Sequence, residues 1–254
     1  MVQFSIVTIN RNNLAGLIKT YASIAAQTYQ HFRWIVMDGA STDGCVEWLG
    51  NVQDPRAEIT SERDKGLYDA MNKGLASAVT TPGYTLFLNS GDTFHDADVL
   101  KQVAHAIQAA GCVPRYVYGD YCLEDATGKL TPVAGKAISH LHLGMPTSHQ
   151  AMYFENQRLS TVRFRDEYKL SADYCMIIEF VSGMDLGEEI LRLPITLCNF
   201  DSTGISQTRR FDALKEDRII RQRFLKHSAL RAGALYFMHF VHTHTKIWRA
   251  PSSS

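Results

Sequence analysis

The chain has 254 residues, of which 45% are apolar, and its 26 basic and 26 acidic side chains give a formal net charge of zero. This length fits one large domain or two small ones, and the composition provides a substantial core. A neutral chain lacks the overall charge with which proteins attract nucleic acid, so we expect no nucleic-acid partner.

The cysteines and the N-terminus indicate the compartment. The five cysteines are scattered and form no Cys-x-x-Cys pair, which is typical of reduced thiols in the cytosol. The apolar run Phe4–Ile9 is too short for the core of a signal peptide. The sequence has no run of about 18 apolar residues, the length that a membrane-spanning helix needs. We therefore expect a cytoplasmic protein.

The first 95 residues alternate between two hydrophobic patterns. Short runs rich in β-branched and aromatic residues predict strands at 4–9, 34–37, 58–60 and 84–88. Apolar residues at helical spacing predict helices over 14–25, 43–49 and 67–78. Strands that alternate with helices favour βαβ units, and therefore an α/β fold with a mostly parallel central sheet.

Polar side chains follow each of these strands. Thr8 and Asn10 lie at the end of the first strand, Asp38 ends the second, Asp64 follows the third, and Asp92 follows the fourth in the stretch Phe87-Leu88-Asn89-Ser90-Gly91-Asp92. Ligands of open parallel sheets bind at the carboxyl ends of the strands. We expect these groups to border one crevice.

The pattern changes after residue 110. Strands are predicted at 116–121, 151–154 and 191–200, with a hairpin turn over 125–129. Apolar residues at helical spacing follow Asp173 over 174–180, and the chain reads as helical from residue 211 almost to its end. We place a main domain at 1–207 and a basic, mainly helical extension at 208–254.

Several common nucleotide and metal motifs are absent. The sequence contains no G-x-G-x-x-G after the first strand, no G-x-x-x-x-G-K-[ST] and no H-E-x-x-H. A divalent ion held by carboxylate oxygen could neutralise a bound diphosphate in place of such a loop. Asp92 is the candidate ligand, and Gly91 before it would let a phosphate approach the backbone closely.

Taken together, these stretches resemble the family 2 glycosyltransferases, which are inverting enzymes with the GT-A fold, a Rossmann-like fold for nucleotide-diphospho-sugars. The resemblance covers roughly residues 3–207 and is strongest to bacterial enzymes that build exopolysaccharide or O-antigen units. The matching stretches are FSIVTINRN, WIVMDGASTDG, SERDKGLYDAMNKGLASA, LFLNSGD, SHQAMYF, LSADYCMIIEF and DSTGIS.

The resemblance implies how a nucleotide would be held. Thr8 and Asn10 would lie near the base and ribose, and Asp38 would accept a hydrogen bond from a ring N–H of the base. The turn Asp64-Lys65-Gly66 would flank the nucleotide. Taken alone, Asp38 before Gly39 is also an ordinary turn residue.

The resemblance also implies the reaction centre. Asp92 matches the last aspartate of the DxD-type motif and would hold Mn²⁺ or Mg²⁺, although Asn89-Ser90-Gly91 replaces the usual carboxylates before it. Asp173 matches the catalytic base, with Ala172 in place of the usual glutamate. We expect the dipole of the following helix to favour the ionised form of Asp173. The alternative interpretation is structural: Asp92 and Asp173 cap the helices that follow them.

His149 follows a glycine-containing loop on a segment expected to border the acceptor. A lone histidine beside a strand is most often structural. The other interpretations are a contact to phosphate or acceptor and a second metal ligand in place of a missing carboxylate.

The C-terminal segment is strongly basic. Residues 209–249 hold ten Lys and Arg against three Asp and Glu. The interpretations are a solvated helix face, a contact with a second subunit in an oligomer, and a contact with anionic lipid. The basic positions concerned are Arg210, Lys215, Arg218, Arg221, Arg223 and Lys226. The lipid interpretation places the protein at the inner face of the cell membrane and suits a lipid-linked acceptor.

The function that follows is transfer of one sugar, with inversion, from a UDP- or GDP-sugar donor to a glycan or lipid-linked oligosaccharide acceptor in bacterial surface polysaccharide synthesis. Two alternatives remain at this point. One is a relative that binds nucleotide sugars without transferring them, and the other is a nucleotide-dependent oxidoreductase, which the missing glycine fingerprint disfavours.

Overall fold

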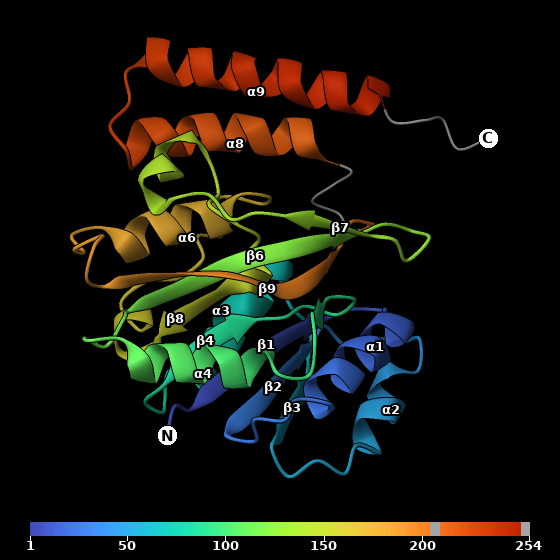
Figure 1. Cartoon of the computed structure of the whole chain (residues 1–254). Coiled ribbons are helices and arrows are strands. Elements are labelled where there is room, and N and C mark those ends of the chain that lie inside the picture. Colours follow the sequence, from blue (N-terminus) through green and yellow to red (C-terminus); the bar gives the residue numbers. More distant parts are fainter. Residues whose placement is uncertain (204–208, 250–254) are drawn as a thin grey trace.

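The computed structural model describes residues 1–203 and 209–249, with the side chains of 246–249 left out. It shows an α/β body with a helical hairpin on top (Figure 1). The strands are β1 (Phe4–Asn10), β2 (Phe32–Asp38), β3 (Ala57–Ser61), β4 (Tyr84–Phe87), β5 (Thr93–Phe94), β6 (Tyr116–Glu124), β7 (Leu130–Val133), β8 (Met152–Glu155) and β9 (Ile190–Asp201). The α-helices are α1 (Leu14–Ala25), α2 (Cys45–Gly50), α3 (Leu67–Ala78), α4 (Val99–Ala109), α5 (Asn156–Leu159), α6 (Ala172–Val181), α8 (Arg210–Arg223) and α9 (Ala229–Arg249). Two short 3₁₀ helices are η1 (Ile138–Leu143) and η2 (His149–Ala151). Every predicted strand and helix is present.

All of these strands belong to one sheet. Their order is β3-β2-β1-β4-β8-β6-β9-β5, and β7 pairs with β6. Strands β1 to β4 pair in parallel, as do β6 and β9, whereas β5, β7 and β8 run in the opposite direction. Six of the nine strands in the described residues therefore share one direction, which confirms the mostly parallel sheet.

Alternate residues of the parallel strands enter two different cores. Val7 and Ile9 of β1 pack with α3 and α6, whereas Phe4 and Ile6 pack with α1, α2 and α4. Successive side chains of a strand point to opposite faces, so these helices must lie on both sides of the sheet. This arrangement brings the carboxyl ends of β1, β2, β3 and β4 together along one edge of the sheet.

The C-terminal hairpin consists of α8 and α9, separated by a short break after Arg223. Helix α8 lies between α9 and α6 (Figure 1), and its Ile220 belongs to the same core as α6. Arg221 was expected on the basic face, but its guanidinium turns inward and donates to the Leu143 carbonyl at 2.9 Å. The predicted boundary at 207 falls in residues 204–208, outside the described residues.

Within the described ranges, none of the helices combines the length and the apolar character needed to cross a membrane.

Candidate active site

A crevice of about 540 Å³ opens at the carboxyl ends of the parallel strands. Its walls come from α3, the turn after β4, the segment that leads into η2, the start of α6 and the end of β9. Three of the sequence-predicted residues, Asp92, His149 and Asp173, line it together. Of the five strand-end residues expected to border one crevice, only Asp92 lines it. The expectation is wrong for the others, which are Thr8, Asn10, Asp38 and Asp64.

Asp92 is held at the crevice wall by a tight turn. Gly91 has a φ of +106°, which disfavours any residue with a side chain, and this turn directs Asp92 inward. The carboxylate accepts from the Gln150 amide at 2.6 Å and from the backbone N–H of Asp201 at 2.9 Å. Helix α4 begins at Val99, after Asp98, so the interpretation of Asp92 as its cap is wrong.

Burial dominates the chemistry of Asp92. Only 4% of the residue is exposed, and this desolvation raises the pKa of its carboxyl to about 7, despite the two hydrogen bonds. The carboxylate of Asp201 adds to the increase. A carboxylate that resists ionisation at neutral pH is stabilised when a cation is bound beside it.

Asp201 is a site residue that the sequence analysis missed. It ends β9 and lines the same crevice, and a Cβ added to Gly91 would lie 3.0 Å from its Oδ2. Its position could not be read from the sequence, because β9 pairs in parallel with β6 and its end meets β5 only in the folded sheet. The polar stretch Asp201-Ser202-Thr203 that ends the strand was the available signal.

The crevice is acidic. Among the lining residues in the described part of the chain, Asp92, Asp173 and Asp201 are acidic and none is Lys or Arg. The described residues contain no cluster of three or more His, Cys, Asp and Glu able to hold a metal by themselves. Mg²⁺ and related ions are commonly held by one or two carboxylates together with substrate phosphates. Asp92 and Asp201 fit that pattern.

Asp173 lies in the first turn of α6. Its Oδ1 accepts from the Tyr174 backbone N–H at 2.9 Å and from the Tyr68 hydroxyl at 3.3 Å, whereas Oδ2 faces His149 at 3.7 Å. Burial raises the pKa of Asp173 to about 6, against the lowering effect of its hydrogen bonds. The start of the helix favours the ionised form as expected, since the Tyr174 N–H lowers the pKa of Asp173, but desolvation outweighs this effect and the net shift is upward. Above pH 6 the group is ionised and basic enough to accept a proton.

His149 lies between Asn89, in the turn after β4, and Asp173, at the start of α6. Its Nε2 lies 3.1 Å from the Asn89 amide nitrogen, and its Nδ1 lies 3.7 Å from Asp173 Oδ2. With Asn89 as donor, the neutral ring carries its proton on Nδ1, facing the carboxylate of Asp173. Burial lowers the pKa of His149 to about 4, so the ring is neutral at physiological pH.

Asp38 lies at the carboxyl end of β2, outside this crevice. It accepts four hydrogen bonds: from Asn10 at 2.7 Å, from the Ser41 hydroxyl at 2.5 Å and its N–H at 3.0 Å, and from Ser61 at 2.7 Å. Burial alone would raise its pKa, but these donors outweigh burial and lower it. A base N–H would have to displace one of the serine hydroxyls, so the predicted nucleotide contact of Asp38 stays a prediction.

The other predicted nucleotide residues differ in their surroundings. Thr8 is completely buried, donates to the Leu88 carbonyl at 2.8 Å and accepts from the Trp34 indole at 2.9 Å, so it supports the wall and offers no surface to a ligand. Asp64 accepts from the Gly66 N–H at 2.9 Å and packs against Gly39, which brings its turn beside that of Asp38. Asn10 is also buried, and its amide oxygen has no hydrogen-bond partner among the residues that the structure describes. Lys65 adjoins this turn and donates its backbone N–H to Asp69.

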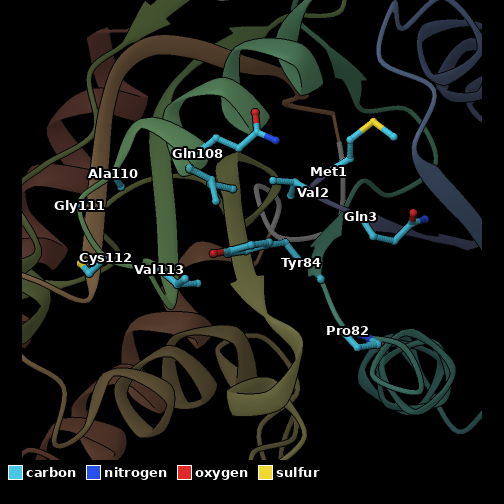
Figure 2. A pocket seen from close by; sticks show the side chains of 12 residues that line it. Met1, Val2, Gln3, Pro82, Tyr84, Gln108, Ala110, Gly111, Cys112 and Val113 are labelled. Carbon is cyan, nitrogen blue, oxygen red and sulfur yellow. The ribbon is translucent and has the colours of Figure 1, made fainter.

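A second hollow lies at the opposite end of the same strands. It has a volume of about 500 Å³ and is lined by the residues before β1, the start of β4 and the segment after α4 (Figure 2). Its lining includes Gln3, Tyr84, Gln108 and Cys112, and within the described part of the chain it contains no Asp, Glu, His, Lys or Arg. This amino-end pocket therefore lacks the carboxylates and the histidine that line the crevice.

The fold and the acidic crevice at the carboxyl ends of its strands are those of a nucleotide-sugar transferase with the GT-A fold. The family model described as glycosyl transferase family 2 matches residues 5–159. The chain therefore belongs to glycosyltransferase family 2 and is a transferase, which confirms the resemblance seen in the sequence and sets the oxidoreductase alternative aside.

Related proteins agree with this assignment. An uncharacterized glycosyltransferase of Mycobacterium tuberculosis is 32% identical over 216 residues, which cover 84% of this chain and 80% of the relative. A PGL/p-HBAD biosynthesis glycosyltransferase of Mycobacterium bovis is 29% identical over 210 residues, with 81% and 79% covered.

Solved structures share the fold at low sequence identity. The TarS fragment of S. aureus in complex with UDP-GlcNAc has a TM-score of 0.66 and 13% identity, and the match covers 96% of this chain and 73% of that one. The mannosyltransferase PcManGT of Pyrobaculum calidifontis in complex with GDP-Man and Mn²⁺ has a TM-score of 0.67 and 14% identity, with 92% and 69% covered.

Proposed function

We propose that the protein moves a sugar, with inversion, from a UDP- or GDP-sugar to a glycan or lipid-linked acceptor in bacterial surface polysaccharide synthesis. The observation that carries this proposal is that one crevice holds two kinds of acidic group. Asp173, with a pKa of about 6, is the base, and Asp92 and Asp201 form an acidic wall apart from it. The family assignment and the nucleotide-sugar complexes of the two structural neighbours support the donor class.

Asp173 performs the proton transfer. As the acceptor hydroxyl attacks the anomeric carbon, its proton passes to the Asp173 carboxylate, a C–O bond to the acceptor forms, and the C–O bond to the diphosphate breaks on the opposite face. Tyr68 and His149 orient the carboxylate through its two oxygens. No covalent intermediate is required, so a single positioned base suffices.

The leaving diphosphate would lie beside the acidic wall formed by Asp92 and Asp201. Mn²⁺ or Mg²⁺, when bound, would neutralise the charge that develops on it. Asp92 and Asp201 are the residues that would hold the ion, and Gln150 fixes the orientation of Asp92. Asn10, Asp38, Asp64 and Lys65 are proposed to form the nucleoside side of the site.

The test is calorimetric titration of the full chain with UDP, GDP, dTDP and CMP, with and without Mn²⁺, followed by product analysis with the matching nucleotide sugar. We expect one nucleotide to bind, to require the ion, and to give a product of inverted anomeric configuration by NMR. Nucleotide binding without any transfer would favour the non-catalytic alternative, and retention of configuration would remove the single-base mechanism.

The outer face of α9 supports a second part of the proposal, contact with an anionic membrane. Leu230 and Phe237 are 84% and 67% exposed, and Met238 and Val241 extend the same helical stripe. The hairpin also carries exposed basic side chains, among them Arg218 of α8 and Arg231, which follows Leu230 in α9. An apolar stripe with basic neighbours is suited to the interface of an anionic bilayer.

Flotation with phosphatidylglycerol vesicles tests this contact. We expect the wild-type chain to float and a Phe237→Asp, Val241→Asp variant to remain in the dense fraction, with Val113→Asp at the amino-end pocket as the control. If the double variant floats like the wild type, the membrane contact is wrong. A dimer that dissociates in the same variant would instead assign the stripe to a subunit interface.

A further inference from the structure

The segment that carries Asp173 is held from outside the crevice by α8. Glu216 of α8 accepts hydrogen bonds from three successive backbone N–H groups, those of Lys169, Leu170 and Ser171, each at 2.9 Å. These residues lead directly into α6, whose first turn contains Asp173. The three amides precede Ala172, the first residue of α6, so the carboxylate of Glu216 fixes the backbone that leads into the helix.

A second contact from α8 lies on the other side of Asp173. The buried guanidinium of Arg221 lies 5.4 Å above the ring of Tyr174, the residue after Asp173, and donates to the Leu143 carbonyl at 2.9 Å. Ser171 adds a hydrogen bond from its hydroxyl to the Ala213 carbonyl of α8 at 3.2 Å. Helix α8 thus holds the chain immediately before and immediately after Asp173.

We propose that Glu216 is a positioning residue for the catalytic base, and that α8 is part of the catalytic apparatus as well as the support of the C-terminal hairpin. This inference rests on the proposed role of Asp173. None of the atoms of Glu216 is within hydrogen-bond distance of Asp173 itself, so the effect passes through the backbone of 169–171.

Electrostatics gives this role a signature that a purely structural one would lack. The charged and titratable groups that interact with Asp173 are Tyr68 of α3, His149 of η2, and Glu216 and Asp217 of α8. The negative charge of Glu216 contributes to the raised pKa of Asp173. A neutral residue at position 216 should therefore move the acid limb of the pH profile to lower pH.

The experiment compares Glu216→Gln and Glu216→Ala with Glu167→Gln in the full chain. Glu167 is a surface residue whose Oε1 lies 2.7 Å from Nη1 of Arg223 in α8. It therefore controls for the loss of a carboxylate next to this helix. We expect kcat to fall on the order of 10- to 100-fold in Glu216→Ala, because small displacements of a catalytic group have effects of that size. The donor KM and the affinity for the nucleotide should be unchanged.

Glu216→Gln keeps the shape of the side chain and one acceptor oxygen. We expect a smaller loss of kcat and an acid limb shifted to lower pH, whereas Glu167→Gln should match the wild type. If Glu216→Ala does not fold, the Gln variant decides. Wild-type kcat and an unmoved acid limb in Glu216→Gln would overturn the proposal.

Failure of the underlying function is distinguishable. If the wild-type chain transfers no sugar, the proposed function fails first. Hydrogen exchange at the amides of 169–173 then tests the contact alone: we expect faster exchange in Glu216→Gln than in Glu167→Gln, and equal rates would show that Glu216 does not hold this segment.

Discussion

Two hollows of similar size lie at opposite ends of the same parallel strands. The crevice at the carboxyl ends has about 540 Å³ and the pocket at the amino ends about 500 Å³. The crevice carries three carboxylates and a histidine, and two of its carboxyl groups, Asp92 and Asp173, have pKa values raised to about 7 and about 6. The amino-end pocket has no acidic or basic side chain.

The difference shows that volume does not define a site in this fold. At the carboxyl ends, turns that follow the strands direct polar side chains into the crevice. The Gly91-Asp92 turn after β4 is the example. Burial then changes the acid strength of the groups placed there. The amino ends contribute backbone and apolar side chains that close the core.

Asp173→Asn should give the largest difference in kcat between a variant of the crevice and a variant of the amino-end pocket. Asp173→Asn removes the proton acceptor and keeps the shape, so we expect a fall in kcat on the order of 10³-fold, within the range for loss of a general base. Nucleotide affinity, measured by calorimetry, should be unchanged. Gln108→Ala in the amino-end pocket is the matched control, and near-normal turnover of Asp173→Asn would remove the mechanism.

The acidic wall should give the next largest effect. We expect Asp92→Asn to lower turnover on the order of 10²-fold and to remove the Mn²⁺ dependence of nucleotide binding, because the ion loses its buried ligand. Asp201→Asn should show the same pattern more weakly, since this carboxylate is less buried. Metal-independent binding in the wild type would contradict the assignment of both residues.

Thermal denaturation checks the protonation of Asp92 independently of turnover. Its pKa is raised on folding, so the folded state holds the proton more tightly, and the metal-free protein loses stability as the pH rises from about 4 to about 7. We expect Mn²⁺ to raise the Tm more at pH 8 than at pH 5, and Asp92→Asn to lose this difference. An equal rise at both pH values would argue against a cation at Asp92.

The sequence predicted the parallel half of the fold and the placement of Asp92, His149 and Asp173 at one edge. Hydrophobic period and strand–helix alternation are local signals, and they sufficed for the parallel strands and for Asp92 at their carboxyl edge, whereas Asp173 and His149 were placed there by the resemblance to the family. Asp201, Gln150 and Glu216 escaped prediction because their roles arise where β9, η2 and α8 meet distant parts of the chain. The raised pKa of Asp173 escaped prediction for the same reason: the start of the helix is visible in the sequence, whereas burial by the surrounding elements is not.

His149 should have a smaller effect than the carboxylates. His149→Ala removes the contacts to Asn89 and Asp173, and we expect kcat to fall about tenfold, at the lower end of effects from misplaced catalytic groups. His149→Gln retains a donor and an acceptor and should recover part of the loss. The acid limb of kcat/KM should stay near pH 6 in both, because it belongs to Asp173 and the pKa of His149 is about 4.

The smallest effect should come from filling the amino-end pocket. Cys112 lines it and is exposed, whereas Cys45, Cys122, Cys175 and Cys198 are buried, so a maleimide should modify Cys112 selectively in the folded chain (Figure 2). The adduct breaks the contact of the thiol with the Glu188 carbonyl at 2.8 Å and occupies the hollow, yet it lies at the far end of the strands from Asp92 and Asp173. We expect mass spectrometry to show one adduct, and turnover and nucleotide affinity to match the unmodified protein. If turnover falls while the fold is intact by circular dichroism, the two hollows are coupled through β1 and β4, and the amino-end pocket belongs to the functional apparatus after all.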